Sequence, residues 1–289
     1  MEKYILLEKA VGETPLACTE AYRSEHVELA GVSMAYAGRL DPMASGKLLV
    51  LLGEECKNQT AYHGLDKEYT FSVLLGIGSD SYDVLGRLRT DSSNCFLQTN
   101  KTNKPSPDET QSLPDTRNLS EKLAAATEVL TGHIELPYPH FSAKTVHGKP
   151  LHVWTLEDRL DEITIPTKES TIYSLQLDSI ETKSRTAVCA EARVKIDSIP
   201  EVTEARKALG NDFRRVDIRQ DWENILHDNA FPDFYHIAHF TCLASSGTYM
   251  RTLAHIIGQK VNAPSLAWSI HRTKIGTYDA TSALWDKQF

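Results

Sequence analysis

The chain has 289 residues, of which 41% are hydrophobic, so it can bury a core for one large domain or two small ones. Its net charge of −8 counts against a nucleic-acid partner and favours a small-molecule enzyme, although a local basic groove can lie on an acidic protein. No apolar run approaches the roughly 20 residues that cross a bilayer, which argues against a membrane protein. Five scattered cysteines without a CxxC pair indicate reduced thiols and a cytoplasmic location.

The first part of the chain predicts strands with one helix between them. Residues 4–7 form a short apolar strand, and a Gly-Glu-Thr-Pro turn then opens a helix that runs to Arg23. The apolar run 47–52 lies between two glycines and fits either a buried strand or a short core helix. Residues 68–78 alternate in polarity as a strand does.

A polar segment and an amphipathic helix follow. Residues 90–118 are rich in Ser, Thr, Asn and Pro, which predicts an exposed loop insertion. The helix occupies 119–132, with Ser120 as its cap and Gly132 at its end.

The second half mixes strands and helices without a regular βαβ repeat. Residues 171–198 predict two strands joined at 181–184, and 201–226 predict a charged surface helix followed by a less regular segment. Residues 236–259 predict a strand, a Ser-Ser-Gly-Thr turn and a helix. This order favours an α+β fold over a doubly wound parallel sheet.

Asp41 is the first candidate for chemistry. An Asp before a Pro commonly begins a turn, with Arg39 available as a surface partner. Here, however, apolar Leu40 and a long apolar run flank the carboxylate, which would hold it rigidly beside a hydrophobic wall. In that setting it needs a cation to stay ionised, and it could then act as a nucleophile.

Arg251 is the natural candidate for that cation. It lies in the first turn of the helix after Ser-Ser-Gly-Thr, and Tyr249 adds an aromatic ring at the same helix start. The turn could also bind a phosphate through its free N–H groups. The alternative is a surface arginine on an amphipathic helix.

Aromatic and basic residues elsewhere indicate a nucleotide or RNA contact. Lys67 and Tyr69 share one strand face, so the ring could stack on a flipped base while the lysine lies near the backbone, although a plain strand aromatic is the alternative. Residues 137–160 form a possible RNA-contacting insertion in which Lys144 lies among aromatic rings, or else a proline-stiffened loop. The histidines show no metal-binding spacing, so we expect no metal site.

Six segments, taken in order, resemble motifs of the TruB family of tRNA pseudouridine synthases, which convert uridine 55 of the T loop. They are LLEKAVGETP, GRLDPMASGKLLVLLGEECK, KEYTFSVLLGIGSDSYDVLG, LPYPHFSAKTVHG, SSGTYMRTLAHIIG and SIHRTKIGTY. The resemblance implies a pseudouridine synthase fold, with a mixed, mainly antiparallel sheet flanked by helices and an active-site cleft across it. It also implies isomerisation without a cofactor, on the T arm of tRNA or another structured RNA. We expect a monomer.

The same resemblance assigns roles to individual residues. It makes Asp41 the catalytic nucleophile and Arg251 its paired cation. Tyr69 matches the tyrosine that stacks on the target base and takes part in proton transfer. Tyr249 and Ile270 match positions that line the uridine pocket.

The chain also departs from the family pattern. Tyr36 stands where the family has a histidine that helps to displace the target nucleotide, and Arg39 makes the motif closer to the RsuA and RluA groups, which act on other RNAs. The closing motif lies so near Phe289 that we expect one catalytic domain over 1–289 without a PUA domain, and weaker or differently targeted RNA binding.

Three other readings follow from these departures and from the candidate residues. The first is a pseudouridine synthase with RsuA-like or RluA-like targets, and the second is a tRNA-binding folding factor with little turnover. The third is a hydrolase that uses Asp41 with another carboxylate, and it is the weakest because no second acid stands in a comparable motif.

Overall fold

The computed structural model describes residues 2–89, 116–201 and 214–289, which form the predicted α+β fold. A nine-stranded sheet runs in the order β1-β3-β12-β4-β11-β10-β7, with β2 paired to β3 and β13 to β12. Its pairs are antiparallel except for β3 and β12, so the sheet is mixed and mainly antiparallel, as expected. The strands are β1 Tyr4–Lys9, β2 Met34–Tyr36, β3 Ala44–Leu52, β4 Asp66–Leu75, β7 Gly132–Pro137, β10 Thr167–Ser184, β11 Phe234–Ala244, β12 Ser265–Asp279 and β13 Leu284–Gln288.

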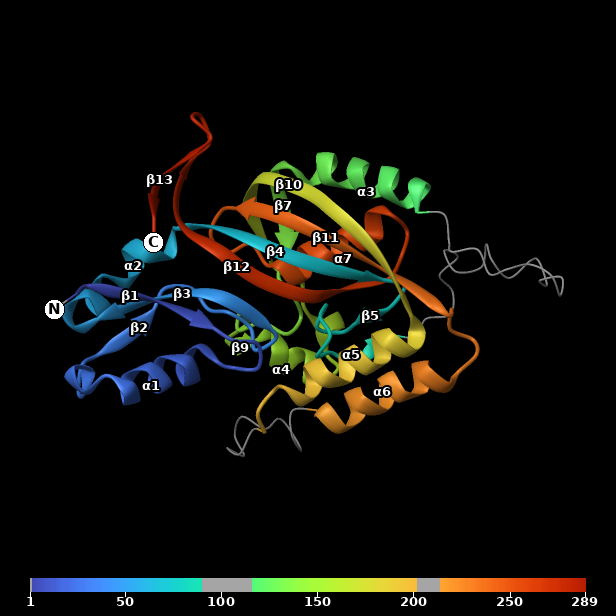
Figure 1. Cartoon of the computed structure of the whole chain (residues 1–289), viewed down its shortest axis with the longest axis horizontal. Helices are drawn as coiled ribbons and strands as arrows, with labels where there is room; N and C mark the ends of the chain where they lie inside the picture. The colour runs from blue at the N-terminus through green and yellow to red at the C-terminus, as the bar shows by residue number, and fades with distance from the viewer. Residues whose placement is uncertain (1, 90–115, 202–213) are drawn as a thin grey trace.

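Helices pack around this sheet, as Figure 1 shows. Helix α7 contacts β4 and β12 and touches α3, whereas α5 and α6 pair with each other beside the sheet. Helix α1 packs on β1 at the N-terminal end. The helices are α1 Pro15–Glu25, α2 Gln59–His63, α3 Arg117–Leu130, α4 Leu151–Leu156, α5 Arg185–Asp197, α6 Arg215–His227 and α7 Met250–Lys260. Among these described helices, none is long and apolar enough to cross a membrane.

Two small hairpins lie outside the main sheet. The first joins β5 (Gly78–Ser79) to β6 (Leu88–Arg89), and the second joins β8 (Thr145–Val146) to β9 (Lys149–Pro150). The first follows the central strand β4 directly, and the second precedes α4. The loop of the first hairpin approaches the central strands, because Asp83 forms a bridge with Ala267 of β12.

Several predicted elements are confirmed. Thr14 caps α1 by accepting the N–H of Ala17 at 3.0 Å, as the turn before that helix predicts. The apolar run 47–52 belongs to strand β3, not to a helix, and its neighbours on both sides explain why it lacks a polar face. Tyr69 and Phe71 are buried on one face of β4.

Other element predictions are wrong or only partly right. Residues 171–198 are not two strands, because β10 continues to Ser184, whose hydroxyl then caps α5 by accepting the N–H of Ala187. The segment after Arg214 is helix α6 and not irregular, because Ile218, Trp222 and Ile225 form a buried stripe at helical spacing.

One predicted helix begins earlier than expected, and two other predictions lie largely outside the described residues. Helix α3 begins at Arg117, and the N–H of Ser120 bonds to the carbonyl of Thr116, so Ser120 lies within the first turn and is not the cap. The predicted loop at 90–118 lies almost wholly outside the described residues, as does the start of the helix predicted from 201.

Candidate active site

Asp41 and Arg251 meet in the folded chain. The Nε atom of Arg251 donates to Oδ2 of Asp41 at 2.7 Å, from the first turn of α7 to the loop between β2 and β3. The Arg251 side chain is 5% exposed, whereas the Asp41 side chain is 40% exposed. The guanidinium therefore lies behind the carboxylate, which keeps an open side toward solvent. Arg39 is exposed, and in the described structure Asp41 pairs with Arg251 and not with Arg39.

Backbone carbonyls fix the guanidinium of Arg251 in place. One terminal nitrogen donates to the carbonyl of Ser81 at 2.9 Å and the other to the carbonyl of Phe141 at 3.1 Å. Although burial lowers the pKa of Arg251, the charges of Asp41 and Asp83 raise it above its usual value. Arg251 is thus a permanently charged group that donates one hydrogen bond from each of its three nitrogens.

Asp83 is a second carboxylate at the same guanidinium, and it was not among the residues selected from the sequence. Its Oδ2 lies 3.6 Å from Nε of Arg251, and its Oδ1 accepts the hydroxyl of Ser81 at 2.7 Å and the N–H of Leu85 at 2.9 Å. Burial raises the pKa of Asp83 to about 6, against the opposing charge of Arg251. Because Asp83 is buried, it does not provide the exposed second acid that a two-carboxylate hydrolase needs.

Tyr69 is connected to the loop that carries Asp41 by Arg272. Tyr69 and Arg272 are paired residues of β4 and β12, and both side chains are buried. Arg272 donates to the carbonyls of Lys47, Arg39 and Gly38, so it joins Tyr69 to the loop that carries Asp41. Burial raises the pKa of Tyr69, with Arg272 acting in the opposite direction, so the phenol is neutral near pH 7.

Lys9 holds the other end of the Asp41 loop. It is 0% exposed, and its Nζ donates to the carbonyls of Ala44 at 2.6 Å, Ala10 at 2.8 Å and Glu13 at 2.8 Å. Burial lowers the pKa of Lys9 to about 8. The buried cations Lys9 and Arg272 thus fix the loop on either side of Asp41.

The family model described as TruB family pseudouridylate synthase (N terminal domain) matches residues 28–198, more than half of the chain. The chain belongs to this family. The matched range includes Asp41, Tyr69 and Asp83, while Arg251 and Arg272 lie beyond it.

Individual relatives agree with this family. The chain is 29% identical to tRNA pseudouridine synthase B of Caldicellulosiruptor saccharolyticus over 177 residues, which cover 61% of this chain and 52% of that protein. It is 26% identical to the protein of that name from Flavobacterium johnsoniae over 252 residues, covering 87% and 76%. A chain in the crystal structure of a Cbf5-Nop10-Gar1 complex has a TM-score of 0.47 and 16% identity, covering 95% of this chain and 49% of that one. The chain spans about half the length of some curated relatives that it matches.

In this TruB family chain, three more predicted residues lie near the Asp41–Arg251 pair. Tyr249 caps α7 two residues before Arg251, and its ring meets the Tyr138 ring edge-to-face at a centroid distance of 5.6 Å. The exposed Lys144 lies over Tyr138, with its Nζ 5.1 Å from the ring centroid. Ile270 is buried in β12, in register with Ala44 of the adjacent strand.

Lys67 is buried and Tyr36 is half-buried. Lys67 is 5% exposed, and its Nζ donates to the carbonyl of Leu65 and, at 3.2 Å, to the hydroxyl of Ser246. Burial lowers its pKa to about 8, and its position argues against direct contact with an RNA backbone. The half-buried Tyr36 packs against the apolar cluster formed by Leu7, Cys18, Leu29, Leu48, Val50 and Leu52.

The buried groups at this site were missed for a common reason. Asp83, Arg272 and Lys9 all lie within the segments that resemble family motifs, but they are far apart in the chain. Lys9 and Arg272 donate to backbone carbonyls, and Asp83 pairs with Arg251, whose position in the chain is distant. No residue spacing reveals such partners. The family motifs themselves were the one available signal for all three.

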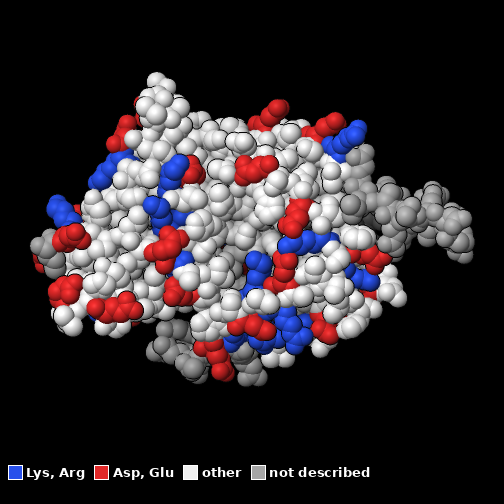
Figure 2. Space-filling view, viewed as in Figure 1, with Lys and Arg blue, Asp and Glu red and all other residues white. Residues whose placement is uncertain are grey.

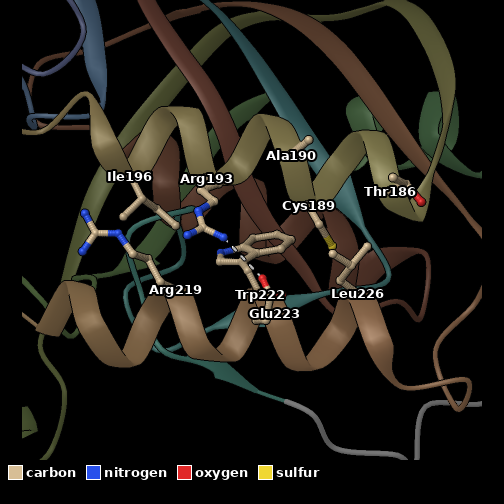
Figure 3. Close-up of a pocket in the computed structure, with 9 residues that line it drawn as sticks. All are labelled: Thr186, Cys189, Ala190, Arg193, Ile196, Arg219, Trp222, Glu223 and Leu226. Atoms are coloured by element: carbon tan, nitrogen blue, oxygen red, sulfur yellow. Dashed lines mark hydrogen bonds and ion pairs between the residues drawn. The ribbon is translucent and has the colours of Figure 1, made fainter.

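A pocket elsewhere in this TruB family protein is not the candidate site. It has a volume of about 210 Å³ and lies between α5 and α6, where Cys189 and Trp222 line it (Figure 3). None of its lining residues is a candidate named from the sequence. Within the described residues, moreover, no three His, Cys, Asp or Glu side chains gather as metal ligands.

Basic side chains on the face drawn in Figure 2 are interspersed with acidic ones. Lysines and arginines gather over α5 and α6, but Arg193 pairs with Glu223 and Arg219 with Asp197. The described residues of this face therefore form no continuous basic track. Arg39 is exposed two residues from Asp41 and makes no ion pair with the described residues, so it is better placed to meet a phosphate.

Proposed function

We propose that the protein is an RNA pseudouridine synthase that isomerises uridine 55 in the T loop of tRNA, with Asp41 as its nucleophile. The observation that carries the proposal is the Asp41–Arg251 pair, because a buried guanidinium holds a partly exposed carboxylate in place by a charge-assisted hydrogen bond of 2.7 Å. Membership of the TruB family supports the reaction class, and the names of the relatives support tRNA as substrate.

In the first of two routes, the chain supplies one covalent partner. An Asp41 oxygen bonds to C1′ of the target nucleotide while the bond from C1′ to N1 breaks, and uracil leaves as an anion. The uracil turns, its C5 attacks C1′, and the bond from C1′ to Asp41 breaks. The proton on C5 is lost and N1 gains a proton. In a second route Asp41 removes the proton on C2′ while the bond from C1′ to N1 breaks, so that uracil leaves as an anion and a glycal forms. C5 of the turned uracil then bonds to C1′ while Asp41 returns the proton to C2′, and the proton on C5 is again lost as N1 gains one. In both routes the atoms balance without a cofactor.

Other residues would hold the extruded nucleotide. Tyr69 stacks on the base, and its neutral hydroxyl can take part in the proton transfer from C5. Tyr249 and Ile270 line the uracil pocket. Arg39 and Lys144 are exposed cations that can contact phosphates on either side of the target. Tyr36 is less well placed for base displacement, because its ring packs against the cluster beneath α1.

We also infer that residues 1–289 act as one catalytic domain, with 137–160 as an RNA-contacting insertion. The hairpin β8–β9 and helix α4 form this insertion, and Lys149 and Arg159 lie over the Trp154 ring. The cysteines that the structure describes are free, which supports action in the cytoplasm.

Tritium release from a T-arm transcript labelled at C5 of uridine tests the reaction. Wild-type protein should release tritium in multiple turnovers, and Asp41→Asn should slow release by about a thousandfold or more. Asp286→Asn is the matched control, because Asp286 is exposed on β13, and it should leave the rate unchanged. Wild-type turnover by Asp41→Asn would refute the nucleophile assignment.

Two further outcomes separate the alternative functions. Tight tRNA binding by an inactive wild-type protein would indicate a folding factor. Pseudouridine mapping of cellular RNA, with and without the gene, should show loss at uridine 55 of tRNA. Loss confined to ribosomal RNA would instead indicate RsuA-like or RluA-like targets.

A further inference from the structure

Two loop segments hold Arg251 from opposite sides. Residues 78–83 supply the carbonyl of Ser81, and residues 137–142 supply the carbonyl of Phe141. The direction of the guanidinium, and hence of its bond to Asp41, depends on how these two segments lie relative to each other. Anything that joins them from outside therefore also positions Arg251.

Arg214 joins the same two segments from outside. Its guanidinium donates to both oxygens of Asp80, at 2.5 and 3.3 Å, and its Cζ lies 4.2 Å from the centroid of the Phe141 ring. Asp80 is next to Ser81 in the chain, and Phe141 is itself the residue whose carbonyl accepts from Arg251. Thus Arg251 links the segments through their carbonyls, and Arg214 links them through their side chains.

A third link lies beside the first two. The hydroxyl of Tyr82 is 3.2 Å from Nε2 of His140, which joins the residues that follow Ser81 and precede Phe141. The Tyr82 ring also stacks on His255, at a centroid distance of 4.2 Å and an angle of 9°. His255 lies one helical turn after Arg251 on α7, so this link reaches the helix that carries the arginine.

Arg214 immediately precedes α6, and that helix is bound to the β5–β6 hairpin. Arg87 beside β6 binds both oxygens of Asp221 in α6, at 2.7 and 3.1 Å, and the N–H of Leu88 donates to Asp221 at 3.0 Å. The Arg214 side chain is 15% exposed and Asp80 is 20% exposed, so water screens their pair only partly. A pair held this rigidly can transmit the position of α6 to the two segments.

Two residues of these links also have unusual backbone conformations. Arg214 and Tyr82 both adopt left-handed conformations, with φ of 65° and 63°, which are uncommon for residues other than glycine. Such conformations persist where surrounding contacts determine them, and they cluster at functional sites. Here the contacts are the links to Asp80, Phe141 and His140.

We propose that Arg214 is a positioning residue for catalysis, which holds segments 78–83 and 137–142 together so that their carbonyls aim Arg251 at Asp41. The catalytic part of this inference rests on the proposed function. Arg214 does not contact the reacting atoms, and its effect is on the geometry of the pair. The competing account is that the Arg214–Asp80 pair only attaches α6 to the rest of the fold.

The test compares Arg214→Gln with Arg219→Gln. Arg219 is also on α6, and it makes an ion pair with Asp197 of α5, so its loss weakens the attachment of α6 without touching either segment. Four quantities are measured: single-turnover tritium release, RNA dissociation constant, melting temperature, and hydrogen exchange of peptides covering 78–83 and 137–142. A third variant, Arg214→Lys, keeps the charge but loses the planar group that binds both oxygens and stacks.

We expect Arg214→Gln to slow single-turnover release by about ten- to a hundredfold, with the RNA dissociation constant within about twofold of wild type. Exchange should accelerate in both segments in this variant and not in Arg219→Gln, which should keep the wild-type rate. Arg214→Lys should recover only part of the lost rate.

Several results would overturn the inference. An active wild type together with an unaffected Arg214→Gln would refute the positioning role while leaving the proposed function intact. Equal losses in the Arg214 and Arg219 variants would show that α6 attachment alone matters, and a change in RNA affinity alone would make Arg214 an RNA contact. If wild-type protein released no tritium, the proposed function would fail and the catalytic part of this inference with it.

Discussion

Asp41 and Asp83 share the guanidinium of Arg251, yet the side chain of Asp41 is 40% exposed and that of Asp83 is 7% exposed. One carboxylate can therefore meet a substrate while the other cannot. The buried acid, together with the carbonyls of Ser81 and Phe141, fixes the arginine that serves the exposed one. Under the proposed function, this division gives Arg251 two separable roles, in stability and in catalysis.

Removing Arg251 should cost both activity and stability. Arg251→Met leaves Asp83 buried without its cation, which should lower the free energy of unfolding by roughly 3–5 kcal/mol in urea titrations. The double variant Arg251→Met with Asp83→Asn should recover much of that stability, because no unpaired buried charge remains. It should not recover tritium release, since Asp41 still lacks its partner. Recovery of activity in the double variant would contradict the role of Arg251.

Asp83 should make stability depend on pH in an unusual direction. Its pKa in the folded protein is raised to about 6 from 3.8, so between these values the folded state holds a proton that the unfolded state has lost. Stability contributed by this group should therefore fall as pH rises from about 4 to 6, by roughly 2–3 kcal/mol in total, and stay constant above. Subtracting the unfolding free energies of Asp83→Asn from those of wild type at pH 4, 5, 6 and 7 isolates the effect. A difference that rises with pH would contradict it.

Substitutions of Lys67 and Lys144 should have different effects on RNA binding. Lys144 is exposed, so Lys144→Ala should weaken binding and lower the slope of log affinity against log salt by about one unit. Lys67 is buried on the carbonyl of Leu65 and the hydroxyl of Ser246, so Lys67→Met should leave that slope unchanged. Salt titrations of a T-arm transcript measure both. A lower slope for Lys67→Met would show that Lys67 contacts the RNA.

The Asp41–Arg251 pair could be predicted from the sequence because each of the two residues has its own signal in the residues around it. A carboxylate beside proline and an apolar run needs a cation, and Arg251 at a helix start was available. The strand pattern likewise placed Lys67 and Tyr69 on one face of β4. Alternation does not show what covers each position, however, so the burial of Lys67 under Ser246 could not be predicted.

The support for the pair could not be predicted, because it depends on backbone atoms. Arg272 bonds to the carbonyls of Lys47, Arg39 and Gly38, and any residue could supply these groups. The helix α6 was missed because its buried stripe lies among charged residues, and its ties to β6 join positions over a hundred residues apart.

Gly46 should be essential for the parallel pairing of β3 with β12. Its φ is 104°, and a Cβ there would lie 2.3 Å from the carbonyl oxygen of Arg272 and 2.6 Å from its nitrogen, so an alanine forces the strands apart. Gly31 is the matched control, because its φ is 75° and, apart from its chain neighbours, no atom of the described residues lies within 4 Å of its Cβ position. Gly31→Ala should cost about 1 kcal/mol from backbone strain alone. Gly46→Ala should cost at least about 3 kcal/mol in urea titrations and reduce tritium release, because Arg272 joins Tyr69 to the Asp41 loop. Equal costs at the two positions would show that β3 and β12 can separate without disturbing the site.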